Sequence, residues 1–187
     1  MHIHSCLLTV LLAVALSLSA AQSALTPGIA LPEDAGEETG VNFGEEYARN
    51  EPSAELPSAV EVEGYGYIGV LEIPALGLRL PVMDDWDYTR LKIAPCRYQG
   101  SVGQGNLVLL AHNYETHFGR LRELQPGDEI DFTDTAGNVH RYAVKEGLIV
   151  DPADVHKVTA SGCPLTLFTC TPGGEMRYSV RCTELTE

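Results

Sequence analysis

The sequence predicts an all-β fold, a sandwich or a barrel, for the part of the chain that begins at Tyr65. Three observations support this prediction. Short runs of apolar and β-branched residues recur along the chain, and several of them alternate with polar residues. Turns that contain glycine or proline separate most of these runs, and patterns typical of helices are sparse. Many short strands with turns between them are typical of sandwiches and barrels.

Seven segments are predicted strands. In chain order they are YIGVLEIP (67–74), LRLPV (78–82), NLVLLA (106–111), DEIDFTD (128–134), VHRYAVKEGLIV (139–150), PLTLFTC (164–170) and MRYSVRC (176–182). The sequence Pro172-Gly173-Gly174 supplies the fixed and positive φ angles of a tight reversal, so the last two strands form a predicted hairpin. Short helices are expected at residues 87–93, 117–124 and near 152–155.

Residues 1–24 are predicted to be an export signal or a membrane anchor. The segment SCLLTVLLAVALSLSAA (5–21) is almost entirely apolar, and small residues follow it. Its length fits a cleavable signal peptide and is marginal for an uncleaved anchor, which needs about 20 apolar residues. These physical arguments alone slightly favour cleavage. In both cases we expect the rest of the chain to lie outside the cytoplasm.

Residues 25–64 are predicted to be an acidic flexible tether, and residues 65–187 the folded domain. From Pro32 to Gly64 there are ten acidic residues and one basic residue, and this composition cannot bury a core. From Tyr65 onward there are 16 acidic and 11 basic residues, a net charge of −5, against −14 for the whole chain. Binding to phosphates needs a concentrated basic face, so nucleic acid is excluded as a partner.

The five cysteines do not form a pattern typical of a metal site. There is no CxxC, and no His–Cys spacing suits zinc, so we expect neither a structural metal nor a cofactor. Cys96 and Cys182 flank predicted strands and are the one pair worth testing for a disulfide. Cys163 is expected in a surface loop, and Cys170 is expected to be a free thiol.

Three side chains make a chemical set for acyl transfer. His112 and Cys170 each stand at the end of an apolar strand, and Arg177 follows the hairpin loop after Cys170. An imidazole can exchange a proton with a thiol, and a guanidinium can stabilise the oxyanion formed on an amide carbonyl. Two other residues compete for these roles. His117 lies five residues beyond His112 without a preceding apolar strand, and Arg181 lies on the same strand face as Arg177 but farther from the loop.

These motifs resemble those of the sortases, cysteine transpeptidases of Gram-positive cell envelopes. The resemblance covers about residues 65–187 and is carried by LLAHN, LTLFTC and RYSVR, in the order His, Cys, Arg. By this resemblance Cys170 is similar to the nucleophile, His112 to the general acid/base, and Arg177 to the oxyanion-stabilising or substrate-positioning arginine. Thr169 matches the threonine that lines the substrate groove. HNYETHF resembles class B sortases, but the segment 149–163 is too short for the long helix of that class.

The resemblance implies a closed eight-stranded β-barrel and an N-terminal segment kept as a membrane anchor on the extracellular face, with secretion after signal cleavage as the alternative. It also implies an LPXTG-like sorting signal as substrate, a thioester intermediate, and an amine of a cell-wall precursor or a pilin as acceptor. We expect a monomer. Two other functions remain open: a secreted cysteine peptidase that hydrolyses the thioester, and a non-catalytic β-barrel binding module.

Overall fold

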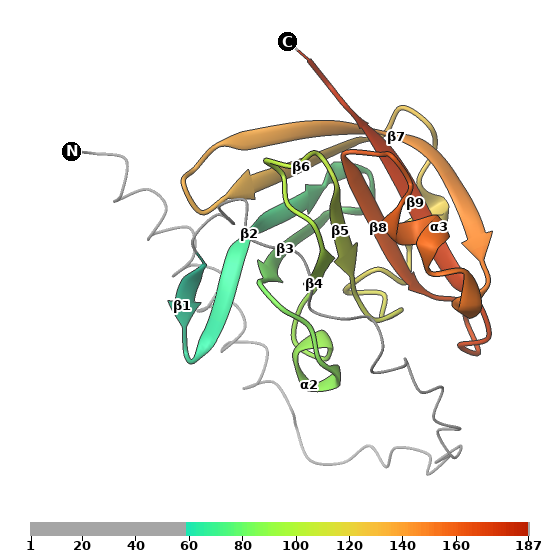
Figure 1. The fold of residues 1–187 in the computed structure, drawn as a ribbon, viewed down its shortest axis with the longest axis horizontal. Coiled ribbons are helices and arrows are strands. Elements are labelled where there is room, and N and C mark those ends of the chain that lie inside the picture. Colours follow the sequence, from blue (N-terminus) through green and yellow to red (C-terminus); the bar gives the residue numbers. More distant parts are fainter. Residues whose placement is uncertain (1–58, 187) are drawn as a thin grey trace.

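The computed structural model describes residues 59–186, which form a β-barrel with a few short helical turns (Figure 1). The strands are β1 (Val60–Val62), β2 (Tyr65–Ile73), β3 (Leu78–Met83), β4 (Cys96–Gln99), β5 (Leu107–Leu110), β6 (Glu129–Asp134), β7 (Val139–Val150), β8 (Leu165–Cys170) and β9 (Arg177–Glu184). The helical elements are η1 (Pro74–Leu76), α2 (Tyr88–Leu91), η2 (Leu121–Glu123), η3 (Pro152–Asp154) and α3 (His156–Thr159).

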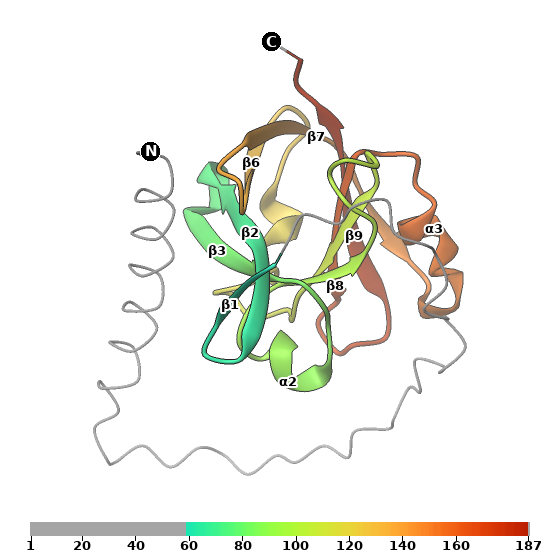
Figure 2. The same cartoon turned by 60° about the vertical axis from the view of Figure 1, so that its left-hand side comes forward.

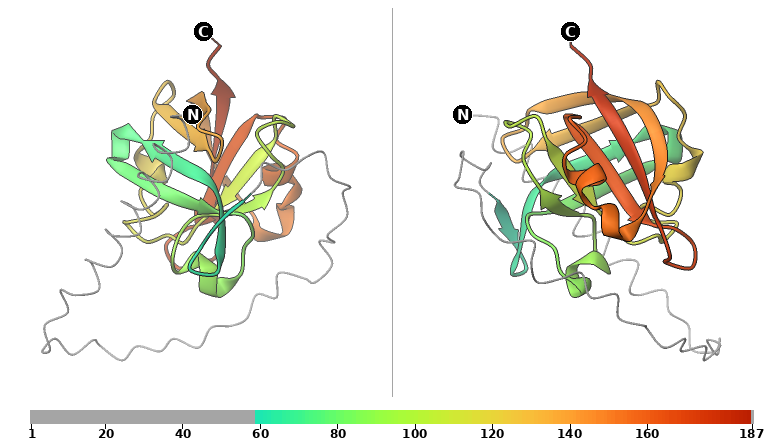
Figure 3. Two further views of the ribbon diagram at one scale, coloured as in Figure 1. Left: turned by 90° about the vertical axis from the view of Figure 1, so that its left-hand side faces the viewer. Right: turned by 45° about the vertical axis from the view of Figure 1, so that its right-hand side comes forward.

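The sheet closes on itself. The strand order is β1-β2-β3-β4-β5-β8-β9-β7-β6, and β6 also pairs with β2. Eight strands, β2 to β9, therefore complete a ring, while β1 forms a hairpin with the first residues of β2, outside the ring. Two views of the ribbon show the ring from different sides (Figure 3). The predicted all-β class and the eight-stranded closed barrel are confirmed.

Gly69 allows the barrel to close. At this residue β2 meets β3 and β6 together, with Val82 and Asp134 as its partners. A Cβ atom placed on Gly69 would lie 2.3 Å from the carbonyl oxygen of Thr133, a separation that side chains do not tolerate. A glycine here lets two backbones approach closely where the strand changes partners.

The apolar side chains divide into two clusters on the two faces of the sheet. The larger cluster includes Leu71, Leu109 and Phe132, all completely buried. The second cluster lies under α2 and α3 and contains Val158 of α3 together with Phe168. Figure 2 shows α2 at the same end of the molecule as the β1–β2 turn, and α3 beside β8 and β9.

As a result, β5 and β8 are buried on both faces. All four residues of β5 are buried, as are the first five of β8. This explains their nearly continuous apolar sequences, because strands that are covered on both faces lose the polar alternation. The two strands are also parallel, so their C-terminal ends lie side by side (Figure 1).

The strand predictions differ from the structure mainly at short elements. β4 and β1 were not predicted. The helix expected at 87–93 is confined to α2, where Asp87 accepts hydrogen bonds from the backbone N–H groups of Thr89 and Arg90. The helix expected at 117–124 is limited to the single turn η2, and the turn expected near 152–155 is η3, with α3 directly after it.

The predicted domain boundaries lie largely outside the described part of the chain. The segments 1–24 and 25–58 are not described, and the last residues of the predicted tether contain β1. Within residues 59–186, no helix has the length and apolar character that a bilayer crossing requires. The proposed export segment and tether therefore stay predictions.

Candidate active site

The parallel pair β5–β8 brings His112 and Cys170 to the same end of the barrel. Leu110 is the register partner of Phe168, and the backbone N–H of Ala111 donates to the carbonyl oxygen of Phe168 at 3.3 Å. The hydroxyl of Thr169 donates to the carbonyl oxygen of Ala111 at 2.8 Å. His112 directly follows Ala111, and Cys170 directly follows Thr169, so both residues stand immediately after this hydrogen bond.

Thr169 is completely enclosed at this position, with 3% of its surface exposed. The sequence placed it in the substrate groove. In the structure its hydroxyl holds the backbone before His112 and fixes the end of β5 against β8, and its place in the substrate groove stays a prediction.

Arg177 is the register partner of Cys170 in the antiparallel pair β8–β9. Side chains of directly opposite residues leave the same face of a sheet with their Cβ atoms about 5 Å apart. The Arg177 side chain is 5% exposed, and its Nη1 donates to the carbonyl oxygens of Gly174 and Met176, at 2.9 and 3.1 Å. The guanidinium is thus fixed under the β8–β9 loop, beside the cysteine.

Arg181, the competing arginine, is directed elsewhere. Its register partner is Thr166, four residues before Cys170. Its guanidinium donates to Glu146 Oε1 at 3.2 Å and to the carbonyl oxygen of Lys157 at 2.6 Å. The structure therefore places Arg177, and not Arg181, next to Cys170.

The two histidines differ in their surroundings. His112 is partly exposed, and its ring stacks on that of Tyr114 with 4.8 Å between centroids and 25° between planes. His117 is buried, and burial, with a smaller effect from the charge of His112, lowers its pKa. A buried neutral imidazole is a poor proton carrier for a surface reaction, so the environment favours His112 as the proton-exchanging residue.

The loop after His112 folds back tightly on itself. The N–H of Phe118 donates to the carbonyl oxygen of His112 at 3.1 Å, and the buried ring of Phe118 anchors the loop in the core. The carbonyl oxygen of Tyr114 accepts from the N–H groups of His117 and Gly119, both at 2.9 Å. A Cβ atom on Gly119 would lie 2.4 Å from the carbonyl oxygen of Asn113, so the turn requires glycine.

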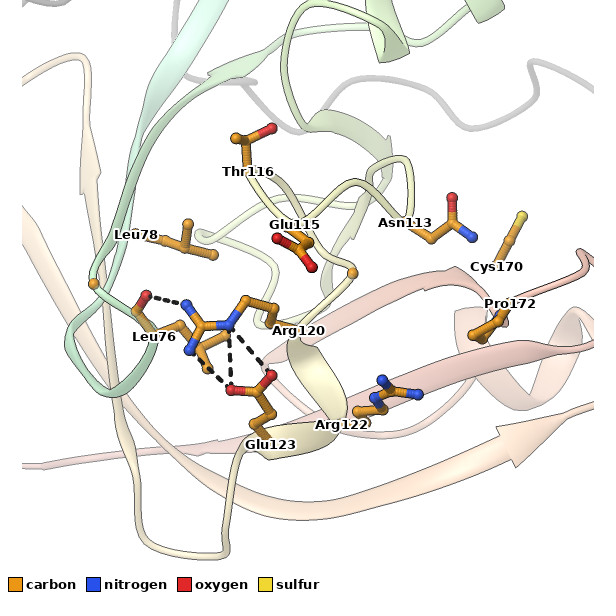
Figure 4. Close-up of a pocket in the computed structure, with 12 residues that line it drawn as sticks. Leu76, Leu78, Asn113, Glu115, Thr116, Arg120, Arg122, Glu123, Cys170 and Pro172 are labelled. Carbon is orange, nitrogen blue, oxygen red and sulfur yellow. Dashed lines mark hydrogen bonds and ion pairs between the residues drawn. The ribbon is translucent and has the colours of Figure 1, made fainter. Parts of the chain in front are cut away.

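A groove of about 660 Å³ opens beside Cys170 (Figure 4). Its walls are the connection between β2 and β3 (Leu76 to Leu78), the segment that follows His112 (from Asn113 to Glu123), and Cys170 with Pro172. An arginine joins the first two walls. Arg120 donates to the carbonyl oxygen of Leu76 at 3.0 Å and to Glu123 at 2.8 Å.

The sequence does not predict the groove residues Asn113, Glu115 and Arg120. Their only signal was their position directly after a candidate catalytic histidine, which gives no information on the direction of a side chain. Asn113 is tied across the site, because its side-chain amide donates to the carbonyl oxygen of Thr171 at 3.5 Å. This hydrogen bond joins the segment that follows His112 to the residue that follows Cys170.

The four cysteines of the described chain are free thiols in different environments. Cys96 and Cys182 are buried, and burial raises the pKa of each to about 12. They lie on β4 and β9, which are separated by β5 and β8, so the pair selected from the sequence is not bonded. Cys163 is buried, not in a surface loop as expected. Cys170 alone among the four is partly exposed and lines the groove.

No group of three or more His, Cys, Asp or Glu side chains within residues 59–186 is arranged to hold a metal ion.

Comparison with known proteins gives a consistent result. A family model described as "Sortase domain" matches residues 71–185. Sortase A from Corynebacterium diphtheriae is similar in structure, with a TM-score of 0.58 and 24% identity over 66% of this chain and 62% of that one. Sortase C from Streptococcus pneumoniae gives 0.58 and 23%, over 68% and 72%. A Clostridium perfringens sortase D5 transpeptidase gives 0.56 and 21%, over 64% and 79%.

A search of curated protein sequences found no match. The structural matches include sortases A, C and D at similar scores, so they do not select a subclass. The chain spans 62% of the length of the Corynebacterium sortase A that it matches.

Proposed function

Because the chain belongs to the sortase family, we propose that it is a cysteine transpeptidase that cleaves an LPXTG-like sorting signal and transfers the acyl part to an amine. The acceptor is an amine of a cell-wall precursor or of a pilin. The observation that carries the proposal is the convergence of three side chains at one end of the parallel pair β5–β8. Cys170 and Arg177 are register partners, and His112 follows the backbone hydrogen bonds that join Ala111 to β8.

In the first half-reaction Cys170 acts as a thiolate, with its proton held by His112. The sulfur attacks the carbonyl carbon of the scissile amide and forms a C–S bond, and the carbonyl π electrons move to oxygen. The guanidinium of Arg177 stabilises this oxyanion. When the C–N bond breaks, His112 gives its proton to the leaving amine, and a thioester remains on Cys170.

The second half-reaction runs in the opposite direction with a new amine. His112, now neutral, removes a proton as the amine attacks the thioester carbonyl, and the thiolate leaves. The same groups serve in both halves, because the leaving amine and the acceptor amine must each exchange a proton with the same imidazole. The groove beside Cys170 has a volume of about 660 Å³, which is enough to take several residues of a peptide substrate.

We further propose that the N-terminal segment keeps the enzyme on the extracellular face of the cell membrane. The apolar residues 5–21 support this, together with the acidic stretch that separates them from the barrel. The barrel would then reach its substrates as a monomer at the end of a tether.

The test is intact-mass measurement of the full chain incubated with a panel of LPXTG-like peptides. We expect an adduct equal in mass to the acyl part of one peptide, which disappears when an amine is added and is replaced by the aminolysis product. Cys170→Ala should form no adduct. Cleavage by Cys170→Ala at the wild-type rate would exclude the proposed chemistry, and an adduct that yields only the free acid in the presence of amines would identify a peptidase.

A further inference from the structure

An exposed aromatic ring lies against the proposed catalytic histidine. Tyr114 is 45% exposed, yet one of its faces is covered by the imidazole of His112. The two rings are 4.8 Å apart and nearly parallel. The Tyr114 ring also contacts His117, at 5.5 Å and 41°. One tyrosine therefore contacts both histidines that compete for the catalytic role.

Hydrogen bonds hold the backbone of Tyr114, and so the point from which its ring extends, close to His112. Its carbonyl oxygen accepts two backbone hydrogen bonds, from His117 and Gly119. The same turn is anchored in the core by Phe118, which is completely buried. The loop is thus built to hold residue 114 over residue 112.

An aromatic face attracts a cation, and only one of the two histidines can supply it. Burial lowers the pKa of His117, so that ring stays neutral near pH 7. His112 is partly exposed and takes up the proton of Cys170 in the proposed mechanism. Its position after β5 brings it near Cys170 on β8 and Arg177 on β9, and its coulombic effect on His117 shows that the two imidazoles of this loop interact. The ring of Tyr114 lies against the plane of the imidazole itself.

We propose that Tyr114 is a positioning residue that fixes the plane of the His112 ring and stabilises its protonated form through its π face. This inference rests on the proposed transpeptidase function and adds to it a residue outside the His–Cys–Arg set. The ring, not the hydroxyl, carries the effect. Within the described chain the Tyr114 hydroxyl makes no hydrogen bond, so Phe should replace Tyr without loss.

The first test does not depend on activity. The titration of His112 is followed by NMR in the full chain carrying Cys170→Ala, which removes the coupled thiol, and its signal is assigned with His112→Gln. A cation–π contact at an exposed site corresponds to a shift of roughly half a pH unit. We expect Tyr114→Ala to lower the pKa of His112 by this amount and Tyr114→Phe to leave it unchanged.

The sign of this shift is decisive. If the tyrosine only shielded His112 from water, its removal would hydrate the imidazolium and raise the pKa. A rise, or no change, in Tyr114→Ala would overturn the inference. An equal fall in Tyr114→Phe would also overturn it, because the hydroxyl would then be responsible.

The second test measures the rate of thioester formation as a function of pH. We expect Tyr114→Ala to lose roughly two- to fivefold in kcat/KM for acylation, with the high-pH limb shifted down by about half a unit. Tyr114→Phe should restore both values. Tyr88→Ala is the matched control, since Tyr88 is another exposed tyrosine, 57% exposed, that packs on Trp86 instead of a histidine.

The two proposals fail in different ways. If the wild-type chain forms no acyl adduct on Cys170, the proposed function fails, while the NMR titration still decides the stacking effect. If the wild type is active and Tyr114→Ala has an unchanged pH profile, only the role of Tyr114 is refuted.

Discussion

Replacing Arg177 with lysine keeps the positive charge and removes the planar guanidinium with its several N–H donors. In the structure one nitrogen, Nη1, already donates to two carbonyl oxygens of the β8–β9 loop, Gly174 and Met176. A guanidinium has five N–H donors spread over three nitrogens, so it can hold the loop and still direct donors toward Cys170. A lysine has one nitrogen and cannot occupy both places. We therefore expect Arg177→Lys to fold but to stabilise the oxyanion poorly.

The expected loss can be estimated from the groups involved. Removing one donor from an oxyanion site typically lowers kcat by about 10²–10³, which is about 2.7–4 kcal/mol. The effect on folding should be smaller, because Met176 O also accepts from the N–H of Thr171 and so keeps a partner. Both carbonyls lose their hydrogen bond to this side chain, and the bond from Arg177 to Gly174 O has no such replacement, which costs about 1–2 kcal/mol in a partly exposed loop.

The assay is single-turnover thioester formation, measured by intact mass, alongside thermal unfolding. Arg181→Lys is the matched control, because Arg181 lies on the same strand and its guanidinium donates to Glu146 and Lys157 instead. An acylation rate for Arg177→Lys within threefold of wild type would refute the reasoning. So would an equal loss in Arg181→Lys, since the effect would then be a general property of β9.

Three further predictions follow from the described contacts. Cys170 should be alkylated first at neutral pH, while Cys96 and Cys182, whose pKa is raised to about 12 by burial, should react only on unfolding; mass mapping over time checks this order. Burial raises the pKa of Asp134, but hydrogen bonds from its own hairpin outweigh burial and hold it below the ordinary value, so Asp134→Asn should cost about 1–2 kcal/mol at pH 7 in urea unfolding. The cost should fall progressively below about pH 4, because the carboxylate of the unfolded chain then takes up a proton while the folded carboxylate stays ionised until its own, lower pKa is passed. Gly119→Ala should slow acylation at least tenfold with a modest change in Tm, because a Cβ atom there would displace the loop that carries His112; an unchanged rate would contradict this.

The fold class could be predicted because alternation and turn residues are local signals. β6, for example, shows the expected alternation in the structure, with Ile130, Phe132 and Asp134 buried and their neighbours more exposed. β4 gives no such signal. Its four residues, CRYQ, have no clear alternation, and they form a strand because they pair with β5, as Cys96 does with Leu110. The local periodicity of a short segment does not show which distant segment it will pair with.

The helix expected after His112 illustrates a different limit. Residues 117–124 have suitable spacing of Phe118, Leu121 and Leu124, and all three side chains are indeed buried. The backbone nevertheless forms only η2, because Gly119 donates to Tyr114 and Arg120 reaches across to Leu76. These contacts favour a tight loop over a regular helix, and the loop is what creates the wall of the groove.

The candidate residues could be named from the sequence because His112 and Cys170 stand at the ends of apolar strands and Arg177 follows the hairpin loop, but their assembly depends on one long-range pairing. His112 and Cys170 are 58 positions apart, and only the parallel alignment of β5 with β8 places them together. Both strands are buried on their two faces, so packing on each side holds them in place. Reactive groups placed directly after the last hydrogen bonds of such strands keep a fixed geometry while their side chains reach solvent. Substitutions of the apolar residues inside β5 or β8 should therefore lower stability and activity together, whereas changes at the exposed residues of the loop after His112, such as Asn113 and Tyr114, should affect activity with little effect on stability.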